Sequence, residues 1–183
     1  AFRYLIMGTI GATFFLIGIG FLYAMTGTLN MADLAERLPQ VRDSNAVHAA
    51  LAFIVVGLGL KLALFPLHLW LPNAYAFAPN FITAFVAATA TKVALYVMLR
   101  FIFTVFSPEF SFVALPLAAV LMALAIAGMV AGSWVAMFEG NLKRMLAYSS
   151  VAQVGYMVLG ISLVTAAGVA AGILHLFNHA LMK

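Results

Sequence analysis

The 183-residue sequence contains no cysteine and few charged residues. Without cysteine the chain can form no disulfide, thiolate metal site, iron–sulfur ligation or cysteine nucleophile, and its redox compartment stays undetermined. Charged residues make up 8% and hydrophobic residues 66% of the chain, against about 25% and about 45–50% in ordinary soluble domains. So few charged side chains cannot cover a water-facing surface. The solvent of this protein is therefore lipid.

The sequence also lacks a basic patch, although its formal net charge is +4. The basic residues are scattered singly, apart from the neighbours Lys143 and Arg144, which argues against a nucleic-acid partner. No signal peptide is visible, and the chain opens on Ala1 and ends at Lys183 within an apolar run. We therefore expect residues 1–183 to be a single membrane domain of a longer protein, truncated at both ends.

Six apolar stretches are long enough to cross a membrane as helices. Runs such as FIVVGLGL do not alternate between apolar and polar residues, as the strands of a membrane barrel would. The sequence therefore predicts an all-α fold, a polytopic transmembrane helix bundle in the cell (inner) membrane. The expected spans are residues 2–24, 47–67, 80–106, 112–138, 145–165 and 167–183.

The longest connection, residues 25–46, holds three of the five acidic residues and is expected to lie in water. A short interfacial helix from Met31 to Leu38, capped by Asn30, is expected within it. The positive-inside rule gives a tie between the two sides of the membrane. We place the loop of Lys143 and Arg144 inside, because the rule works best for short loops.

Both tryptophans lie near the ends of predicted spans. Tryptophan is enriched at membrane interfaces, where its ring is partly apolar and partly polar. Trp70 and Trp134 are therefore expected to be interfacial anchors.

Three of the four lysines lie inside predicted spans: Lys61, Lys92 and Lys183. A lysine at the centre of a spanning helix costs about 2.5–3.5 kcal/mol, more than most structural roles would offset. All five acidic residues fall in connections or at span ends, so none is placed to neutralise these lysines. Lysine can release its proton when burial disfavours the charged form, whereas arginine cannot. We expect Lys61 and Lys92 to carry protons; the alternative is that their amines snorkel to the interface.

The last span carries titratable side chains on one helix face, because His175, His179 and Lys183 follow i, i+4, i+8 spacing. We call them the His–His–Lys row. Histidine titrates nearest neutral pH, so the row suits stepwise proton transfer through intervening water. One alternative is a zinc site, although no third protein ligand is apparent and no metal is expected. Another is plain hydrogen bonding between helices.

The fifth span carries a neutral polar stripe, formed by Ser149, Gln153 and Tyr156 at i, i+4, i+7 spacing. These groups cannot exchange charge, but they can hold water along a pathway. Hydrogen bonds between neighbouring helices explain them equally well.

Three prolines, Pro66, Pro72 and Pro79, follow Lys61 within a short distance. Proline removes a backbone donor, so the second span cannot continue as a regular helix beyond Phe65. Irregular backbone at membrane depth is tolerated where it borders a cavity, as in the discontinuous helices of transporters. The alternative is an ordinary proline-rich turn at the membrane surface. In this stretch His68 and Asn73 could face either the cavity or the interface.

Four strings in the chain resemble a known family. KLALFPLHLWLPNAYAFAPN, ATATKVALYVMLRF, NLKRMLAYSSVAQVGYM and HLFNHALMK, in this order, are similar to the core of the antiporter-like subunits of respiratory complex I and of Mrp-type multisubunit cation/proton antiporters. The D-type subunit of Mrp antiporters has the nearest resemblance, followed by complex I subunits M and N. The resemblance implies a fold of about fourteen helices with two inverted repeats, of which this chain holds about six.

The resemblance also implies roles for individual residues. It places Lys61 beside the break of a discontinuous helix, Lys92 on the helix that connects the pathway, and the His–His–Lys row on a second discontinuous helix. It further implies that a glutamate on a helix before Ala1 pairs with Lys61. Asn141 departs from the family, since many relatives carry aspartate there.

We therefore expect a proton-translocating subunit of a multisubunit Na+/H+ antiporter. Protons would move through Lys61, Lys92, the His–His–Lys row and water, supported by Pro66, His68 and the polar stripe. The alternatives are a proton-pumping subunit of NADH-quinone oxidoreductase or a membrane-bound hydrogenase, and a passive membrane scaffold. The expected partners are other membrane subunits, lipid, protons and Na+. No residues that bind a redox cofactor are evident, so neither a cofactor nor redox chemistry of its own is expected.

Overall fold

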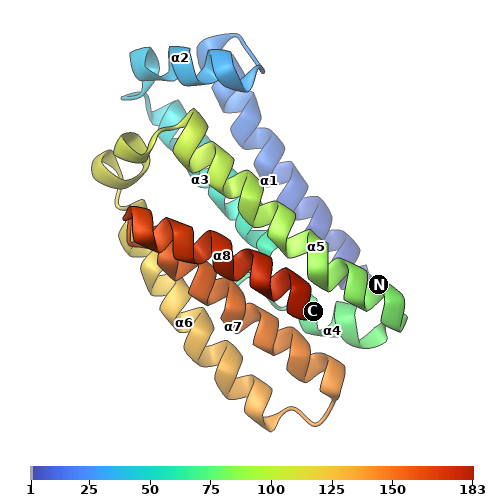
Figure 1. Ribbon diagram of the computed structural model, residues 1–183. Helices are drawn as coiled ribbons and strands as arrows, with labels where there is room; N and C mark the ends of the chain where they lie inside the picture. Colours follow the sequence, from blue (N-terminus) through green and yellow to red (C-terminus); the bar gives the residue numbers. More distant parts are fainter. Residues whose placement is uncertain (1) are drawn as a thin grey trace.

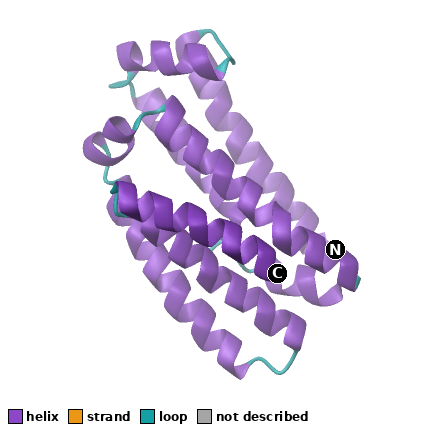
Figure 2. Ribbon diagram, in the orientation of Figure 1, coloured by secondary structure: helices purple, strands orange, loops and turns teal. Residues whose placement is uncertain are grey.

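Each apolar stretch of the sequence forms a helix in the computed structural model, which describes residues 2–183 (Figures 1 and 2). Within that range no β-strand occurs. The helices are α1 (Phe2–Thr26), α2 (Met31–Val41), α3 (Asn45–Leu62), α4 (Leu71–Phe77), α5 (Asn80–Leu99), α6 (Leu117–Phe138), α7 (Leu142–Ser162) and α8 (Ala166–Met182), with two π-helical segments, η1 (Arg100–Val105) and η2 (Glu109–Ala114).

Five helices are long and apolar enough to cross a membrane, and the chain is a multi-pass membrane protein. They are Phe2–Thr26, Asn45–Leu62, Asn80–Val105, Leu117–Phe138 and Leu142–Ser162. The sixth expected span is the shorter α8, with 17 residues. The predicted all-α bundle is confirmed, while the second and fourth spans are shorter than expected. The second stops at Leu62, and the fourth starts at Leu117 because η2 forms a separate segment before it.

The helix predicted in the long connection is present as α2, and it extends to Val41, further than the predicted end at Leu38. The Asn30 side chain accepts a hydrogen bond from the Ala32 amide at 2.9 Å, which satisfies a free donor at the start of α2. Leu34 and Leu38 are buried, so α2 lies with its apolar face on the bundle. In Figure 1 it crosses one end of the molecule, near the end of α1.

Two closely packed helix pairs form the frame of the bundle, α1 with α3 and α6 with α7. Glycine allows both close approaches. A Cβ on Gly57 of α3 would lie 2.7 Å from the Gly11 carbonyl oxygen of α1, and one on Gly155 of α7 would lie 2.8 Å from the Ala125 carbonyl oxygen of α6. Small residues of this kind let membrane helices gain packing contacts, because lipid supplies no hydrophobic force between them.

The helices α5 and α8 lie between the two pairs. α5 contacts α3 and α8, and α8 contacts α7, so the elements form a continuous series from one pair to the other (Figure 1). This order places the helix of Lys92 beside the helix of the His–His–Lys row.

The short helix α4 and the loop between α6 and α7 lie at the end of the bundle opposite α2 (Figure 1). α4 packs against α7 and α5. The Lys143 amine donates to the Ala78 carbonyl at 2.8 Å and so ties the start of α7 to the end of α4. Asn141 caps α7 by accepting a hydrogen bond from the Arg144 amide at 3.2 Å. The amide side chain keeps the capping function that an aspartate would have.

We expect Gly155→Leu to destabilise the protein by about 1–3 kcal/mol, because the new side chain would overlap the backbone of α6. The measurement is thermal unfolding of the full-length protein in detergent. Gly20→Leu is the matched control, since a Cβ on Gly20 meets no atom within 4 Å. Equal melting temperatures for the two variants would contradict the close packing of α6 and α7.

Candidate functional site

The predicted break in the second span lies directly after Lys61. α3 ends at Leu62, and Ala63 adopts a left-handed conformation with φ of 60°. The Leu62 carbonyl would need the amide of residue 66, which is a proline and has no N–H. Residues 63–70 then form turns that lead into α4.

Trp70 closes the broken end of α3, so its expected place as an interfacial anchor is wrong. Its side chain is buried, and the indole nitrogen donates to the Leu60 carbonyl at 2.8 Å. The turn thereby supplies a second donor to this carbonyl, which also accepts from the Ala63 amide at 3.2 Å. Trp134, by contrast, is exposed and packs on Phe138 of the same helix, with 5.5 Å between ring centroids. Trp134 thus lies on the surface of the described bundle, and its role as an interfacial anchor stays a prediction.

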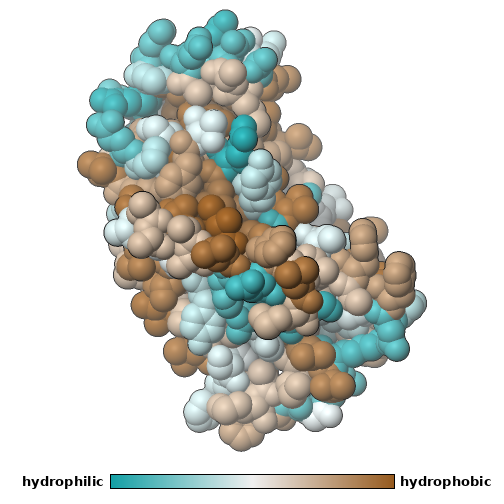
Figure 3. Space-filling model, viewed as in Figure 1, coloured by the Kyte–Doolittle hydropathy of each residue, from teal (hydrophilic) through white to brown (hydrophobic). Residues whose placement is uncertain are grey.

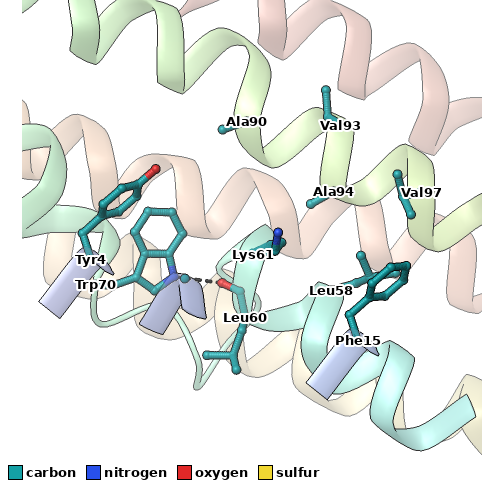
Figure 4. A pocket seen from close by; sticks show the side chains of 11 residues that line it. Tyr4, Phe15, Leu58, Leu60, Lys61, Trp70, Ala90, Val93, Ala94 and Val97 are labelled. Atoms are coloured by element: carbon teal, nitrogen blue, oxygen red, sulfur yellow. Dashed lines mark hydrogen bonds between the residues drawn. The ribbon is translucent and has the colours of Figure 1, made fainter. Parts of the chain in front are cut away.

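Lys61 lies in the last turn of α3, on the wall of a cavity of about 490 Å³ between α1, α3 and α5. Figure 4 shows its amine pointing toward α5, on the side where Ala90 and Ala94 lie. The wall is largely apolar and contains no acidic residue in the described part of the chain. It consists of Tyr4, Gly8, Phe15, Leu58, Leu60, Lys61, Trp70, Ala90, Val93, Ala94 and Val97.

Within residues 2–183, no ion pair joins a carboxylate to a lysine of the membrane spans. Two ion pairs occur within residues 2–183, Arg42 with Asp43 at 3.9 Å and Arg144 with Glu139 at 3.7 Å. Both lie at the ends of helices. Two of these lysines, Lys92 and Lys183, have backbone carbonyls as their partners instead.

His68 faces the interior of the bundle, while Pro66 is exposed. The His68 ring stacks on Phe65, with 5.3 Å between ring centroids, and meets the edge of Tyr148 of α7 at 6.3 Å. Its Nδ1 atom is buried and has no hydrogen-bond partner among residues 2–183. The broken segment thus directs a titratable ring toward α7.

Lys92 is buried within α5, with 7% of its surface exposed. Its ammonium donates to the Ala87 carbonyl on the same helix. The Lys92 amine therefore does not snorkel to the interface, because it is bonded inside the bundle.

In the His–His–Lys row, His175 and His179 lie on α8 and Lys183 is the residue that caps its end. The rings of His175 and His179 are parallel, with 6.4 Å between centroids. His179 is 1% exposed, and neither of its ring nitrogens has a hydrogen-bond partner in the described chain. Lys183 donates to the Leu146 carbonyl of α7 at 2.9 Å.

Two members of the polar stripe on α7 meet the row. His175 Nε2 donates to Gln153 Oε1 at 2.6 Å, and the Tyr156 ring approaches His175 edge-on at 6.1 Å. Ser149 makes no side-chain hydrogen bond within residues 2–183. Its neighbour Ser150 is the buried serine, and its hydroxyl donates to the Leu146 carbonyl at 3.0 Å.

A second cavity, of about 200 Å³, joins the surroundings of Lys92 and Lys183. Ala87, whose carbonyl accepts from Lys92, and Lys183 both belong to its wall. In Figure 3 a hydrophilic area interrupts the apolar surface near the end of α8. The structure therefore brings Lys92 and the row together, whereas Lys61 lies on a separate cavity.

The sequence does not predict the positions of three residues near these cavities. Trp70 and Tyr75 look like ordinary aromatic residues of an apolar stretch, and Lys143 looks like a topology signal beside Arg144. The one available signal is the density of aromatic and polar residues among the prolines after Lys61. It does not say which of them point inward.

Residues 1–183 match the family described as "NADH:quinone oxidoreductase/Mrp antiporter, TM". NADH-quinone oxidoreductase subunit N of Desulforudis audaxviator is 51% identical over 100% of this chain and 36% of the relative. The D-type subunit of the Na(+)/H(+) antiporter of Alkalihalophilus pseudofirmus is 30% identical over 99% of this chain and 36% of the relative. The chain thus spans about a third of the length of these relatives.

Two solved structures have the same arrangement of helices. A chain of the membrane-bound sulfane sulfur reductase, an archaeal respiratory membrane complex, matches with a TM-score of 0.87 and 40% identity, over 98% of this chain and 36% of that one. A chain of the Mrp complex from Dietzia matches with a TM-score of 0.86 and 32% identity, over 97% of this chain and 32% of that one.

We expect Trp70→Phe to destabilise the protein by about 0.5–1.5 kcal/mol, because the Leu60 carbonyl would lose the indole donor and keep only the Ala63 amide. Thermal unfolding in detergent measures the loss. Trp134→Phe makes the same change at an exposed position and should shift stability by no more than about 0.5 kcal/mol. Equal melting temperatures for the Trp70→Phe and Trp134→Phe variants would refute the capping role of Trp70.

Proposed function

Because the chain belongs to the membrane family shared by NADH:quinone oxidoreductases and Mrp antiporters, we propose that it is part of a proton-translocating subunit of a multisubunit membrane complex. The observation that carries this proposal is the group of titratable side chains inside the bundle. Lys92, His179 and Lys183 lie on adjacent helices, and carbonyls rather than carboxylates accept the hydrogen bonds of the two lysines.

The partners of Lys92 suit a group that gives up its proton. A carbonyl stabilises an ammonium at membrane depth less than a carboxylate does, since it carries no full charge. A second positive charge that arrives on His179 or Lys183 disfavours the charge on Lys92 further. Arrival of one proton can therefore drive release of another, which is the step that a proton pathway requires.

His179 is suited to pass protons between the two lysines. Its ring is buried between α8 and its neighbours, and its nitrogens have no protein partner within residues 2–183. Buried polar groups are normally satisfied by protein or by ordered water, so water bridges to this ring are expected. A neutral imidazole can accept a proton on one nitrogen and release one from the other.

Lys61 is a second proton carrier in the proposed pathway. It lies beside the broken end of α3. The α5 wall of its cavity does not include Lys92. Transfer between these lysines requires water in the cavity of about 490 Å³, which has room for it. We retain the prediction that a carboxylate outside residues 1–183 pairs with Lys61.

For the driving reaction, a redox complex of the NADH-quinone oxidoreductase type is the first candidate. The subunit N relative is more similar in sequence than the Na(+)/H(+) antiporter relative, so the comparisons do not favour the expected Na+/H+ antiporter over it. The Mrp-type antiporter is the second candidate, because the fold also matches a chain of the Mrp complex closely. Na+ as a substrate belongs to this second candidate only.

Purification of the native complex separates the two candidates. Flavin and iron–sulfur absorbance that co-purifies with the subunit supports the redox complex. A colourless complex that exchanges Na+ for protons in vesicles supports the antiporter and overturns the first candidate.

We expect Lys61→Met to abolish proton transport by the complex while leaving membrane insertion intact, because an apolar span inserts more easily. Lys61→Arg should fail as well, since arginine keeps its proton. Proton uptake into vesicles measures both. Normal transport in Lys61→Met would refute the carrier role, and normal transport in Lys61→Arg would show that a fixed charge is sufficient.

We expect His179→Gln to slow proton transport strongly, because glutamine keeps hydrogen-bonding capacity but cannot titrate. His175→Gln is the matched comparison. Its loss should be about tenfold at most, or about 1.4 kcal/mol in barrier terms, because His175 is already bonded to Gln153 and lies further from Lys183. A larger loss in His175→Gln than in His179→Gln would contradict the proposed order. If chelation of the wild type reproduced the His179→Gln defect, zinc binding would replace proton transfer as the role of the row.

A further inference from the structure

Tyr75 of α4 is a buried residue with an unused hydroxyl. Its side chain is 3% exposed, and the hydroxyl oxygen has no hydrogen-bond partner within residues 2–183. A buried phenol normally finds a partner, because an unpaired polar group costs free energy in an apolar interior. The position of this hydroxyl therefore calls for a functional explanation.

Tyr75 belongs to the walls of two cavities, on either side of the α4–α5 turn. The first, of about 250 Å³, is lined by Tyr4, Asn73, Ala74, Tyr75, Phe77, Ala78, Ile82, Thr83 and Val86. The second is the cavity of about 200 Å³ that contains Lys183 and Ala87. Tyr75 thus stands between the exposed end of α4 and the surroundings of Lys92.

One other residue, Thr83, lines both cavities, but its hydroxyl is occupied. It lies within hydrogen-bond distance of the Tyr75 carbonyl at 3.0 Å and of the Pro79 carbonyl at 3.1 Å. Its proton is therefore committed to the backbone. Of the two hydroxyls carried by residues of both walls, that of Tyr75 has no partner within residues 2–183, so it remains able both to donate and to accept.

The charges around the second cavity suit protons and water better than a metal cation. Lys143 and Lys183 lie on its wall, and no acidic residue of the described chain does. The positive charges of these two amines repel a cation, whereas water carries no net charge and is not repelled. The volume of about 200 Å³ has room for several water molecules.

We propose that the Tyr75 hydroxyl relays protons between these two cavities and so connects Lys92 and Lys183 with the membrane surface at the α4 end of the bundle. The oxygen accepts a proton from water on one side while its own hydroxyl proton passes to water on the other. The residue is neutral before and after each transfer. This inference rests on the proposed proton-translocating function.

The test uses the full-length subunit in its complex, reconstituted in vesicles, with proton uptake as the measurement. Tyr75→Phe keeps the ring and removes the hydroxyl, and it should slow uptake about five- to tenfold without lowering the melting temperature. Tyr75→His restores a group that donates and accepts, and it should transport faster than Tyr75→Phe. Tyr96→Phe is the matched control, since Tyr96 is an exposed tyrosine of α5 and should transport normally.

A packing role predicts the opposite order, because phenylalanine preserves the shape of the ring better than histidine does. Faster transport in Tyr75→Phe than in Tyr75→His, or normal transport in Tyr75→Phe, would overturn the relay. If the wild-type complex moves protons and the Lys61→Met complex does not, either of these two outcomes refutes the relay and leaves the proposed function intact. A wild-type complex that moves no protons would refute the proposed function itself.

Discussion

An ammonium group at membrane depth must find its partners inside the protein, and the rest of the structure depends on this constraint. Lys92 and Lys183 meet it with the carbonyls of Ala87 and Leu146. These partners accept a hydrogen bond but carry no full negative charge, so they hold each lysine in place without fixing its proton. The same choice explains why titratable groups can gather on α5 and α8 in a part of the chain whose ion-paired acids lie at helix ends.

The frame that holds these groups is closely packed at its glycines. The pairs α1–α3 and α6–α7 approach closely at glycines such as Gly57 and Gly155, so they position the helices between them. The interruption after Lys61 is contained by the indole of Trp70, which bonds a carbonyl at the end of α3. Irregular backbone is thereby confined to the place where it borders a cavity.

In the proposed function, proton movement is separate from the reaction that drives it. The same arrangement of helices occurs in a membrane-bound sulfane sulfur reductase and in an Mrp complex. The fold alone therefore does not decide between redox-driven pumping and antiport. In the proposed pathway, the residues of α3, α5 and α8 move protons, and the driving reaction belongs to other parts of the complex.

The sequence by itself determined the helices, the break after Lys61 and the shared face of His175 and His179. Hydropathy, proline and helical periodicity act within a few neighbouring residues, so each of these features is readable locally. The tertiary structure decided that Trp70 is buried and that Tyr75 stands between two cavities. These features depend on contacts between helices far apart in the chain, and the periodicity of one helix does not specify which neighbour its faces will meet.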